Sequence, residues 1–372
     1  MNSYPKLGMK RALVTGITGQ DGPYLARLLL AKGYKVFGTY RRVSTPNFWR
    51  LQQLGIANKI TLIPADLTDM SSLLEAVSIS DPHEIYNLAA QSYVGSSFDQ
   101  PLLTTDIDAS GSTRFLEIIR HLNKNIKFYQ ASTSELYGAF TEQMQDENSP
   151  MIPNSPYAAA KLHSYNMARI YRNSYGLFTC NGILFNHESP LRGLEFVTRK
   201  ITNSVARIKL GLQKDLKLGN LEAKRDWGFA PEYCYAMYKM MQHKHPDDYV
   251  IATGETHSVR EFAQLAFETV GLNWRDYVIS DKKLHRPLDV HQLCGNHNKA
   301  QRILGWKPKV TFKELVKLMV ETDLKLWQKH LAGEPFPWDA PNHSPEMDIV
   351  ARNVTKDANR EARAFKVKMK LF

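Results

Sequence analysis

Side chains that can move protons stand together in the stretch ASTSELYG. Thr133 and Ser134 supply hydroxyls there, and Glu135 supplies a carboxylate beside them. A Tyr-x-x-x-Lys pair, Tyr157 and Lys161, follows a short way downstream. Tyrosine, lysine and threonine suffice to move a hydride to or from a carbinol carbon, because the phenol can accept the hydroxyl proton. The added carboxylate predicts a further step, in which a C–H proton is removed and water is lost.

Tyr157 and Lys161 lie four residues apart on a predicted helix introduced by the dipeptide Ser-Pro, so their side chains share one face. A nearby ammonium lowers the pKa of a phenol, which makes Tyr157 a better base. The spacing alone is unspecific, since Tyr235 and Lys239 repeat it and are interpreted as packing residues. Thr133 separates the two cases, because it is expected at the carboxyl end of a strand, where ligands bind in open α/β sheets.

Glu135 has two possible roles. A glutamate at the end of a strand is often only solvated, but the position of Glu135 between Thr133 and the tripeptide Leu-Tyr-Gly favours catalysis. It would remove a proton next to a transient ketone, where the C–H acidity is raised. Ser134 would either hydrogen-bond the same substrate hydroxyls or hold Glu135 in place.

Apolar, strand-like runs alternate with helical patterns through the first half of the chain. The run 11–15 ends in a glycine-rich turn, and a helical pattern at 24–32 and a second strand at 35–39 follow. Further strands are expected at 60–63, 84–88, 126–130 and 178–185. This alternation predicts an α/β fold with a doubly wound parallel Rossmann sheet.

After Asn186 the rhythm of the pattern changes, which predicts a smaller mixed α/β lobe beside the sheet. The expected division is a dinucleotide-binding domain at 9–185 and 215–255, a substrate lobe at 186–214 and 256–335, and a C-terminal extension at 336–372. The extension opens on a proline-rich stretch without periodicity and continues as a basic tail, interpreted as solvated rather than as a specific binding arm.

Three glycines, Gly16, Gly19 and Gly22, form a G-x-x-G-x-x-G turn directly after the first strand. Glycines let the backbone turn tightly and approach a pyrophosphate, whose charge the helix N-terminus then meets. The alternative, a purely structural turn, is disfavoured by the strand–turn–helix context. The predicted cofactor contacts in this turn are Gly16, Thr18, Gly19, Gln20, Asp21 and Gly22.

The end of the second strand separates NAD from NADP. An acidic residue there would bind the ribose 2′-hydroxyl, but the chain has Arg41 and Arg42. Two guanidiniums suit a 2′-phosphate, so NADP is the predicted cofactor, against the alternative of a solvated charge pair. Asp66 and Leu67 would bracket the adenine, and further cofactor contacts are expected at Leu88, Ala89 and Ala90.

Composition limits the class of protein. With 43% hydrophobic and 23% charged residues, the 372-residue chain resembles an ordinary globular enzyme. Three scattered cysteines fit a reducing cytoplasm, and the apolar runs are too short to span a membrane. The formal charge of +11 favours acidic partners, either nucleic acid or phosphorylated small molecules. A substrate and a cofactor that both carry phosphates explain this excess adequately, so no nucleic acid and no membrane partner is expected.

The chain resembles the extended short-chain dehydrogenase/reductases and, among them, the GDP-mannose 4,6-dehydratase family. Blocks typical of that family occur in order over most of the chain: TGITGQDG, NLAAQS, STSELYG, SPYAAAK, GILFNHESP, FVTRKI and RILGWKP. The Thr-Ser-Glu triplet is itself diagnostic, because dehydratases of dTDP-glucose typically place Asp before the Glu. The resemblance implies a lyase, cytoplasmic and homo-oligomeric (a dimer or tetramer), that acts on a GDP-sugar.

The implied reaction is an internal redox cycle. Tyr157 takes the C4 hydroxyl proton while a hydride passes from C4 to NADP, and Glu135 then removes the C5 proton as water leaves from C6. The same hydride returns to C6. The resemblance adds His187 and Arg192 to the cofactor contacts, with a loop-stabilising role as the alternative for His187. It implies substrate contacts at Asn186, Val197, Lys200, Arg225, Arg286 and Asp289.

One segment departs from the family pattern. The family usually has R-P-x-E-V-D where this chain has Arg286, Pro287, Leu288, Asp289, Val290 and His291, which leaves the choice of sugar open. GDP-manno-heptose is therefore an alternative to GDP-mannose, and an epimerase or reductase of the same fold is a second alternative that would not need Glu135. A third is a non-catalytic NADP-binding protein, against which the intact catalytic residues count. No metal is expected, because the nearby histidines and Cys294 complete no four-ligand pattern.

Overall fold

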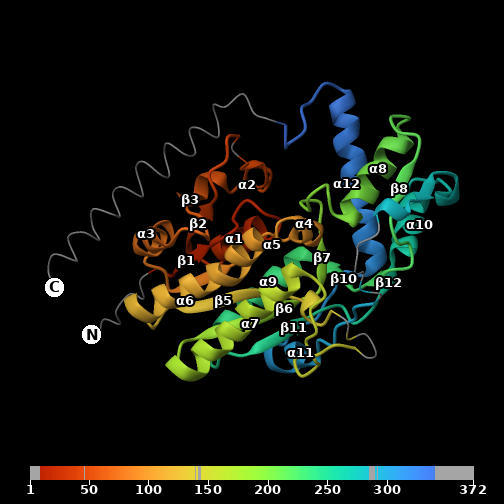
Figure 1. The fold of residues 1–372 in the computed structure, drawn as a ribbon. Coiled ribbons are helices and arrows are strands. Elements are labelled where there is room, and N and C mark those ends of the chain that lie inside the picture. Colours follow the sequence, from red (N-terminus) through yellow and green to blue (C-terminus); the bar gives the residue numbers. More distant parts are fainter. Residues whose placement is uncertain are drawn as a thin grey trace.

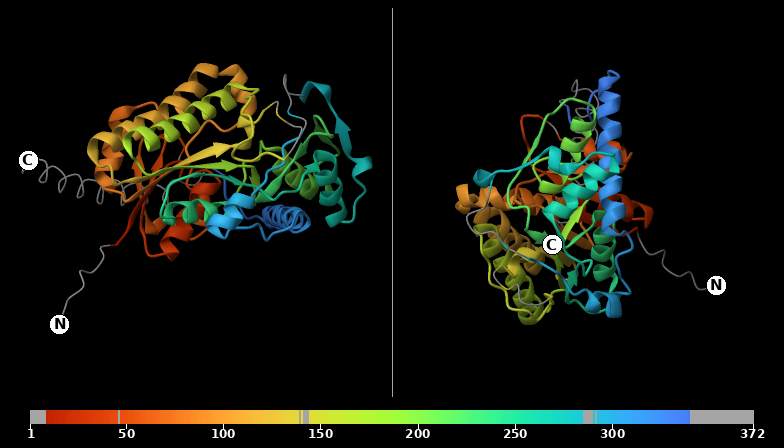
Figure 2. Two further views of the ribbon diagram at one scale, coloured as in Figure 1. Left: turned by 90° about the horizontal axis from the view of Figure 1, so that it is seen from below. Right: turned by 90° about the vertical axis from the view of Figure 1, so that its right-hand side faces the viewer.

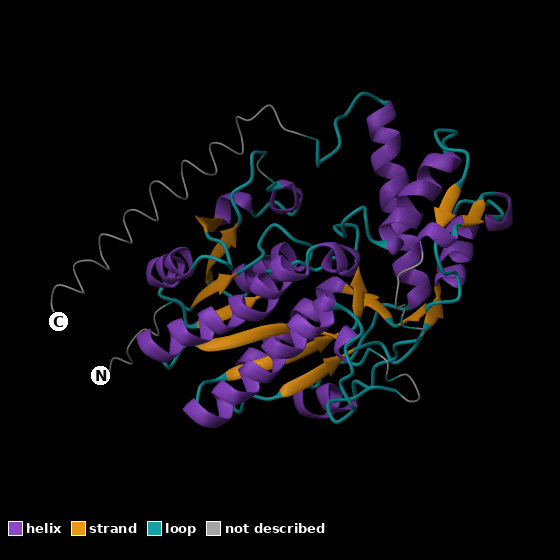
Figure 3. Cartoon of the chain, in the orientation of Figure 1, coloured by secondary structure: helices purple, strands orange, loops and turns teal. Residues whose placement is uncertain are grey.

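The computed structural model describes residues 9–45, 47–138, 140, 144–284, 290 and 292–339 (Figure 1). A seven-stranded sheet, parallel throughout, crosses the centre of the molecule (Figure 3). Its strands are β1 (Arg11–Val14), β2 (Lys35–Tyr40), β3 (Ile60–Pro64), β4 (Glu84–Asn87), β5 (Lys127–Thr133), β6 (Thr179–Leu184) and β11 (Asp248–Ile251). Their order is β3-β2-β1-β4-β5-β6-β11, so the direction of winding reverses between β1 and β4. Ligands bind at such switch points, outside the carboxyl ends of the strands.

Helices cover both faces of the sheet (Figure 2). The described helices are α1 (Asp21–Ala31), α2 (Trp49–Gln53), α3 (Met70–Ser80), α4 (Val94–Asp99), α5 (Pro101–Thr105), α6 (Gly111–Leu122), α7 (Pro156–Tyr175), α8 (Val197–Lys209), α9 (Ala230–Gln242), α10 (Val259–Thr269), α11 (Asn298–Leu304) and α12 (Phe312–Leu331), and of these α8, α10 and α12 pack together away from the sheet. Shorter turns are the 3-10 helices Ala57–Lys59, Ser134–Leu136, Trp274–Asp276 and Lys282–Leu284, and the π-helical turn Asp106–Ser110. None of the described helices combines the length and the apolar character that a bilayer crossing requires.

Two apolar layers sandwich the sheet. On one face, α1 packs against α9, and buried residues such as Leu29 and Met237 cover Val14. On the other face, α3, α6 and α7 pack together, and Phe115 lies against Phe128 of β5. Because both faces are covered, the strands are buried along nearly all of their length, as expected for a parallel sheet.

A smaller lobe adjoins the sheet, built from α8, α10 and α12 around its own apolar core (Figure 1). Its strands form two-stranded ladders, in which β7 (Asn186–Glu188) pairs with β10 (Trp227–Phe229), β8 (Leu216–Leu218) with β13 (Val278–Ser280), and β9 (Lys224–Arg225) with β12 (His257–Ser258). Trp227 is 2% exposed and packs on Phe262 and Phe312 in this core.

The predicted α/β fold with a doubly wound parallel sheet and a second lobe is confirmed. The predicted strands are found to within a few residues, and β11 adds a strand that the pattern did not reveal. The predicted domain limits remain a prediction. Since Leu216 and Leu218 pack in the core of the lobe, the first residues after 215 belong more naturally with the lobe than with the sheet.

Candidate functional site

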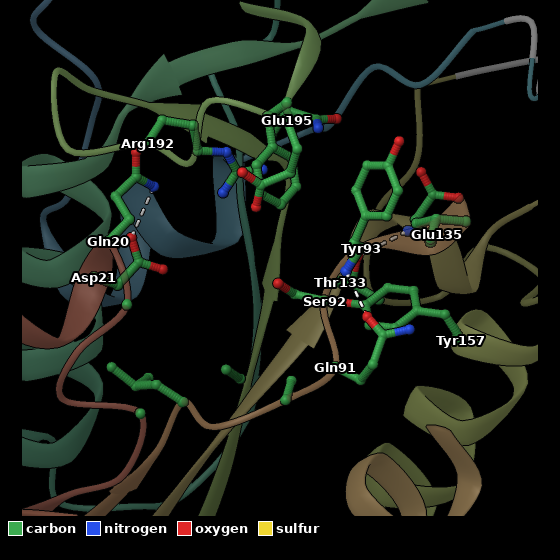
Figure 4. Close-up of a pocket in the computed structure, with 18 of the residues that line it drawn as sticks. Gln20, Asp21, Gln91, Ser92, Tyr93, Thr133, Glu135, Tyr157, Arg192 and Glu195 are labelled. Atoms are coloured by element: carbon green, nitrogen blue, oxygen red, sulfur yellow. Dashed lines mark hydrogen bonds between the residues drawn. The ribbon is translucent and has the colours of Figure 1, made fainter. Parts of the chain in front are cut away.

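A pocket of about 840 Å³ lies at the carboxyl ends of the sheet strands and continues into the lobe. Figure 4 shows Arg192 and Glu195 on one side of it and Tyr93, Glu135 and Tyr157 on the other. The volume is within the range of small-molecule sites. Among the predicted site residues that the structure describes, all but Arg42 line this pocket. Arg286 and Asp289 lie outside the described residues.

The glycine-rich turn is compact because its glycines approach other backbone atoms. Gly16 has a φ of +64°, and a Cβ there would lie 2.9 Å from the backbone nitrogen of Ala89. A Cβ on Gly22 would lie 2.6 Å from the carbonyl oxygen of Gly16, so α1 could not pack so closely. At Gly19 the space is open apart from that same carbonyl, at 3.3 Å. The missing Cβ of Gly19 thus leaves room for a phosphate to reach the backbone, and the turn fits a dinucleotide.

A buried hydroxyl joins this turn to the neighbouring strand. The Oγ1 atom of Thr15 donates to Asn87 at 2.9 Å and accepts the backbone N–H groups of Leu88 and Ala89, both at 2.9 Å. The segment after β4 is therefore held against the segment after β1 at the switch point. Leu88, Ala89 and Ala90 line the pocket as predicted residues, and Gln91 and Ser92 continue the same wall.

Asp21 and His187 form a buried ion pair beside the turn. The Nε2 atom of His187 lies 2.8 Å from Oδ2 of Asp21, and its Nδ1 atom lies 2.7 Å from the carbonyl oxygen of Phe185. Both ring nitrogens face acceptors, which favours the imidazolium form. Burial alone would lower the pKa of His187, but the charge of Asp21 and the hydrogen bonds to Asp21 and Phe185 together outweigh burial, and the pKa is raised. His187 thus stabilises the turn, while its ring still lines the pocket.

Arg192 carries positive charge to the same end of the pocket. Its guanidinium stacks 3.7 Å from the ring centre of Phe196, and its Nε lies 3.3 Å from a carboxylate oxygen of Glu188. Gln20 ties this segment to the glycine turn, because its side chain donates to the carbonyl of His187 at 3.0 Å and accepts from Ser189 at 2.8 Å.

The end of β2 presents two exposed arginines, of which Arg41 lines the pocket and Arg42 does not. Asp66, at the end of β3, also lines the pocket, and its Oδ1 accepts from the backbone and hydroxyl of Thr68 at 2.9 and 2.8 Å. Leu67 is buried next to it. This edge of the pocket therefore combines cationic and apolar groups.

The proton-moving side chains converge at the carboxyl end of β5. Thr133 is the last residue of the strand, and its Oγ1 accepts the backbone N–H of Glu135 at 3.2 Å (Figure 4). That bond starts the 3-10 turn Ser134–Leu136, which turns Glu135 toward the pocket. The start of α7 is fixed by Ser155, whose Oγ accepts from the backbone of Ala158 at 3.1 Å.

Tyr157 and Lys161 project from the first turns of α7 and are both buried. The Nζ atom of Lys161 donates to the carbonyl of Ala131 at 3.1 Å and lies 5.9 Å from the ring centre of Tyr157. Burial and the nearby charge of Asp108 raise the pKa of Tyr157, and a hydrogen bond with Thr133 opposes that shift. Burial lowers the pKa of Lys161, and Asp108 opposes that shift as well.

The four predicted substrate residues that the structure describes come from the lobe side of the pocket. Asn186 lies on β7, and its buried Oδ1 has no hydrogen-bond partner among the described residues. Val197 and Lys200 lie on the first turn of α8, and burial lowers the pKa of Lys200. Arg225 is buried on β9 and donates to the carbonyl of Val290 at 2.7 Å. Cations and an amide are thus grouped where an anionic ligand would extend from the sheet.

Several lining residues were not predicted. Gln91, Ser92 and Tyr93 follow β4, and the rule that ligands bind at carboxyl ends of strands could have identified them. Glu195 and Phe196 lie in a loop without periodicity, so the sequence gives no signal for them.

The chain is similar to several known proteins in sequence and in fold. The sequence profile of the GDP-mannose 4,6 dehydratase family matches residues 13–319. GDP-mannose 4,6 dehydratase 1 of Arabidopsis thaliana is 52% identical over 327 residues, covering 85% of this chain and 90% of the relative. The GDP-mannose 4,6-dehydratase of Vibrio cholerae is 45% identical over 366 residues, covering 89% and 98%. The solved dTDP-glucose 4,6-dehydratase of Bacillus anthracis, in complex with NAD, has a TM-score of 0.75 at 22% identity, covering 86% and 98%.

Proposed function

Given that the chain belongs to the GDP-mannose 4,6-dehydratase family, we propose that it converts GDP-mannose to GDP-4-keto-6-deoxymannose and water. The enzyme is then a hydro-lyase whose NADP is regenerated in each turnover. The observation that carries this proposal is the grouping of Thr133, Glu135, Tyr157 and Lys161 at one edge of a pocket that the glycine turn also lines.

The oxidation half of the reaction requires a base at the C4 hydroxyl. Tyr157 would fill this role, and the proposal is supported by Thr133, which lies beside it and can orient the same hydroxyl. The Lys161 ammonium near the ring stabilises the phenolate that Tyr157 must form. A bound nicotinamide would supply the hydride acceptor and, after dehydration, the hydride donor.

The elimination half requires a second base on the other side of the sugar carbon chain. Glu135 is separated from Thr133 by one residue, and the 3-10 turn directs its carboxylate into the pocket (Figure 4). It would take the C5 proton once C4 is a ketone, and water would leave from C6. A reductase or epimerase of this fold would have no use for this carboxylate, so Glu135 favours the dehydratase.

The preference for NADP is supported by charge. Arg41 lines the pocket at the end of β2, where an acidic residue would select NAD, and Arg42 stands next to it. A guanidinium can pair with a 2′-phosphate through two hydrogen bonds. On the substrate side, Lys200 and Arg225 would meet the diphosphate of the GDP-sugar, and Asn186 would hydrogen-bond a sugar hydroxyl or phosphate oxygen.

We also propose a cytoplasmic homo-oligomer. The three cysteines, Cys180, Cys234 and Cys294, are free and buried, which suits a reducing compartment. Sedimentation of the purified protein distinguishes a monomer from a dimer or tetramer.

The function is tested by offering the purified enzyme a panel of GDP-sugars, including GDP-mannose and GDP-manno-heptose, and analysing the products by mass spectrometry and NMR. We expect GDP-mannose to lose one water and to form a C4 ketone. In D₂O, deuterium should enter at C5 and not at C6, since the hydride returns internally. Deuterium at C6, or turnover of the heptose alone, contradicts the proposal.

A further inference from the structure

A carboxylate that the proposed reaction does not use lies behind the catalytic pair. Asp108 is 3% exposed and belongs to the π-helical turn Asp106–Ser110, between α5 and α6. Its Oδ1 accepts the backbone N–H of Gln91 at 2.7 Å, whereas its buried Oδ2 has no hydrogen-bond partner among the described residues. Buried polar atoms are almost always paired, so a lone carboxylate oxygen requires a reason.

Asp108 is fixed against α7, the helix that carries Tyr157 and Lys161. The hydroxyl of Ser164 donates to the backbone carbonyl of Asp108, and the hydroxyl of Ser112 donates to Ser164 at 2.7 Å. Ser164 lies three residues after Lys161 on α7. The contact therefore holds the segment Asp106–Ser110 against α7 about one turn of that helix beyond Lys161. Turns of the π type are frequent at functional sites because they redirect side chains.

Lys161 has unused hydrogen-bonding capacity in the same region. An ammonium has three donors, and the one hydrogen bond of Lys161 among the described residues goes to the carbonyl of Ala131. Burial lowers the pKa of Lys161, and the charge of Asp108 is what opposes this shift. The same charge, after burial, raises the pKa of Tyr157. One carboxylate thus acts on both members of the pair wherever it is ionised, which is above its own pKa, raised by burial to about 6.

We propose that Asp108 is a positioning residue that sets the ionisation of the Tyr157–Lys161 pair by supplying the buried negative charge that keeps the Lys161 ammonium charged. The inference rests on the proposed function, because that function makes Tyr157 the base. The carboxylate favours charged Lys161 and disfavours the Tyr157 phenolate. Its removal should therefore lower the pKa of both groups.

Few other charged groups on the elements packed around Asp108 could act on Tyr157 and Lys161 in its place. The packed helix α5 reads PLLTT and has no titratable side chain. On the turn itself, Asp106 is paired with Arg114 at 2.6 Å and is directed outward, with its side chain 44% exposed. On α7, His163 contacts Thr113 at the surface. Glu135 lies on the same side of the pocket as Tyr157 and also raises the pKa of Tyr157, and the substitution of Asp108 leaves it in place. Asp106 therefore offers a matched control on the same turn.

The first test is the pH profile of kcat/KM for Asp108→Asn. The amide oxygen of Asn can still accept from Gln91, so the variant removes the charge and keeps this anchor. We expect both limbs of the profile to move to lower pH, by about one unit. Asp106→Asn, which removes a charge on the solvent side, should leave both limbs in place. A reduced rate with unmoved limbs overturns the proposal, because it indicates a structural role only.

A second measurement separates this inference from the function. The tyrosinate absorbance of the holoenzyme minus that of Tyr157→Phe reports the ionisation of Tyr157 without turnover. The same subtraction is made with the Asp108→Asn variant, with and without Tyr157→Phe. The midpoint pH of Tyr157 ionisation should then be lower than in the wild type, and an equal midpoint contradicts the inference. Absence of dehydratase activity in the wild type defeats the proposed function alone. Should Asp108→Asn fail to fold, Asp108→Ser also removes the charge and serves in both measurements.

Discussion

The sheet side and the lobe side of the pocket place their functional groups by different means. On the sheet side, Gly16 follows β1 and Thr133 ends β5, and both strands belong to one continuous seven-stranded sheet. On the lobe side, Asn186 and Arg225 lie on strands of three and two residues, each paired with a single partner strand. Backbone hydrogen bonds therefore fix the first set, and the second set depends more on side-chain contacts.

The two sides also differ in how an ion pair changes the pKa of its carboxylate. On the sheet side, Glu117 of α6 binds Arg120 and Tyr171 of α7 with its side chain 32% exposed, and these hydrogen bonds lower the pKa of Glu117 to about 2. In the lobe, Asp323 of α12 binds Arg199 of α8 with both side chains 1% exposed, and burial raises the pKa of Asp323. The same pairing chemistry thus gives opposite shifts, because desolvation dominates in the lobe.

The largest expected effect lies on the sheet side, in catalysis. Glu135→Gln keeps the size of the side chain and removes the base, so kcat should fall by about 10³-fold or more. NADP should remain bound, since Glu135 is remote from the glycine turn, and calorimetry checks this. Glu135→Asp keeps a carboxylate and should retain more activity than the amide. Near-normal turnover of Glu135→Gln contradicts the assignment of the base.

The next effect concerns stability of the lobe. Asp323→Asn leaves the Arg199 guanidinium buried without its charge partner, and the free energy of unfolding should fall by about 3–5 kcal/mol. Glu117→Gln is the matched variant on the sheet side and should cost at most about 1 kcal/mol. Urea unfolding measures both. Replacing both partners, Arg199→Met with Asp323→Leu, should recover most of the lost free energy of unfolding. Equal losses in Asp323→Asn and Glu117→Gln would contradict the difference between the lobe and the sheet side.

A smaller effect is expected in cofactor choice. Arg41→Ala should weaken NADP binding by about 10- to 100-fold, the range for losing a charge-assisted hydrogen bond, and should leave NAD binding nearly unchanged. Arg42→Ala should have a weaker effect, since Arg42 does not line the pocket. Titration of both cofactors into each variant provides the measurement. Equal losses for NADP and NAD argue against contact with a 2′-phosphate.

The smallest effect is a pH dependence of stability. Because the pKa of Glu117 is lower in the folded chain than its ordinary value of 4.5, this group stabilises the fold above that value and loses its contribution as the pH falls toward about 2. Relative to Glu117→Gln, the wild type should therefore lose up to about 1 kcal/mol on acidification, after allowance for solvent screening. A difference that is constant between pH 7 and pH 3 counts against the pairing.

The sheet and its glycine turn could be predicted because their signals are local. Buried parallel strands are short apolar runs, and Gly16 and Gly22 occur where the backbone of a neighbouring segment leaves no room for a Cβ. Thr133 and Tyr157 were predicted on the same basis, since strand ends and a Ser-Pro helix start can be recognised in the sequence.

The remaining features depend on contacts between distant segments. No local pattern shows that Arg199 binds Asp323 across 124 residues, or that the charge of Asp108 acts on Lys161. His187 likewise required the fold to reveal Asp21 as its partner. Periodicity places a residue on a face of its own element, and it does not say which charged group occupies the facing element.

The chain passes between the sheet and the lobe more than once. It leaves after β6, builds β7, α8 and the short ladders, and returns to add α9 and β11 before leaving again. No single cut therefore yields an intact half: a fragment that ended after β6 would expose that strand as an unpaired edge and leave α1 without α9. During synthesis on the ribosome, the sheet can be completed only after the residues of β11 have emerged. From this interleaving we expect the two parts to fold as one unit, so that a defect in the lobe also delays completion of the sheet.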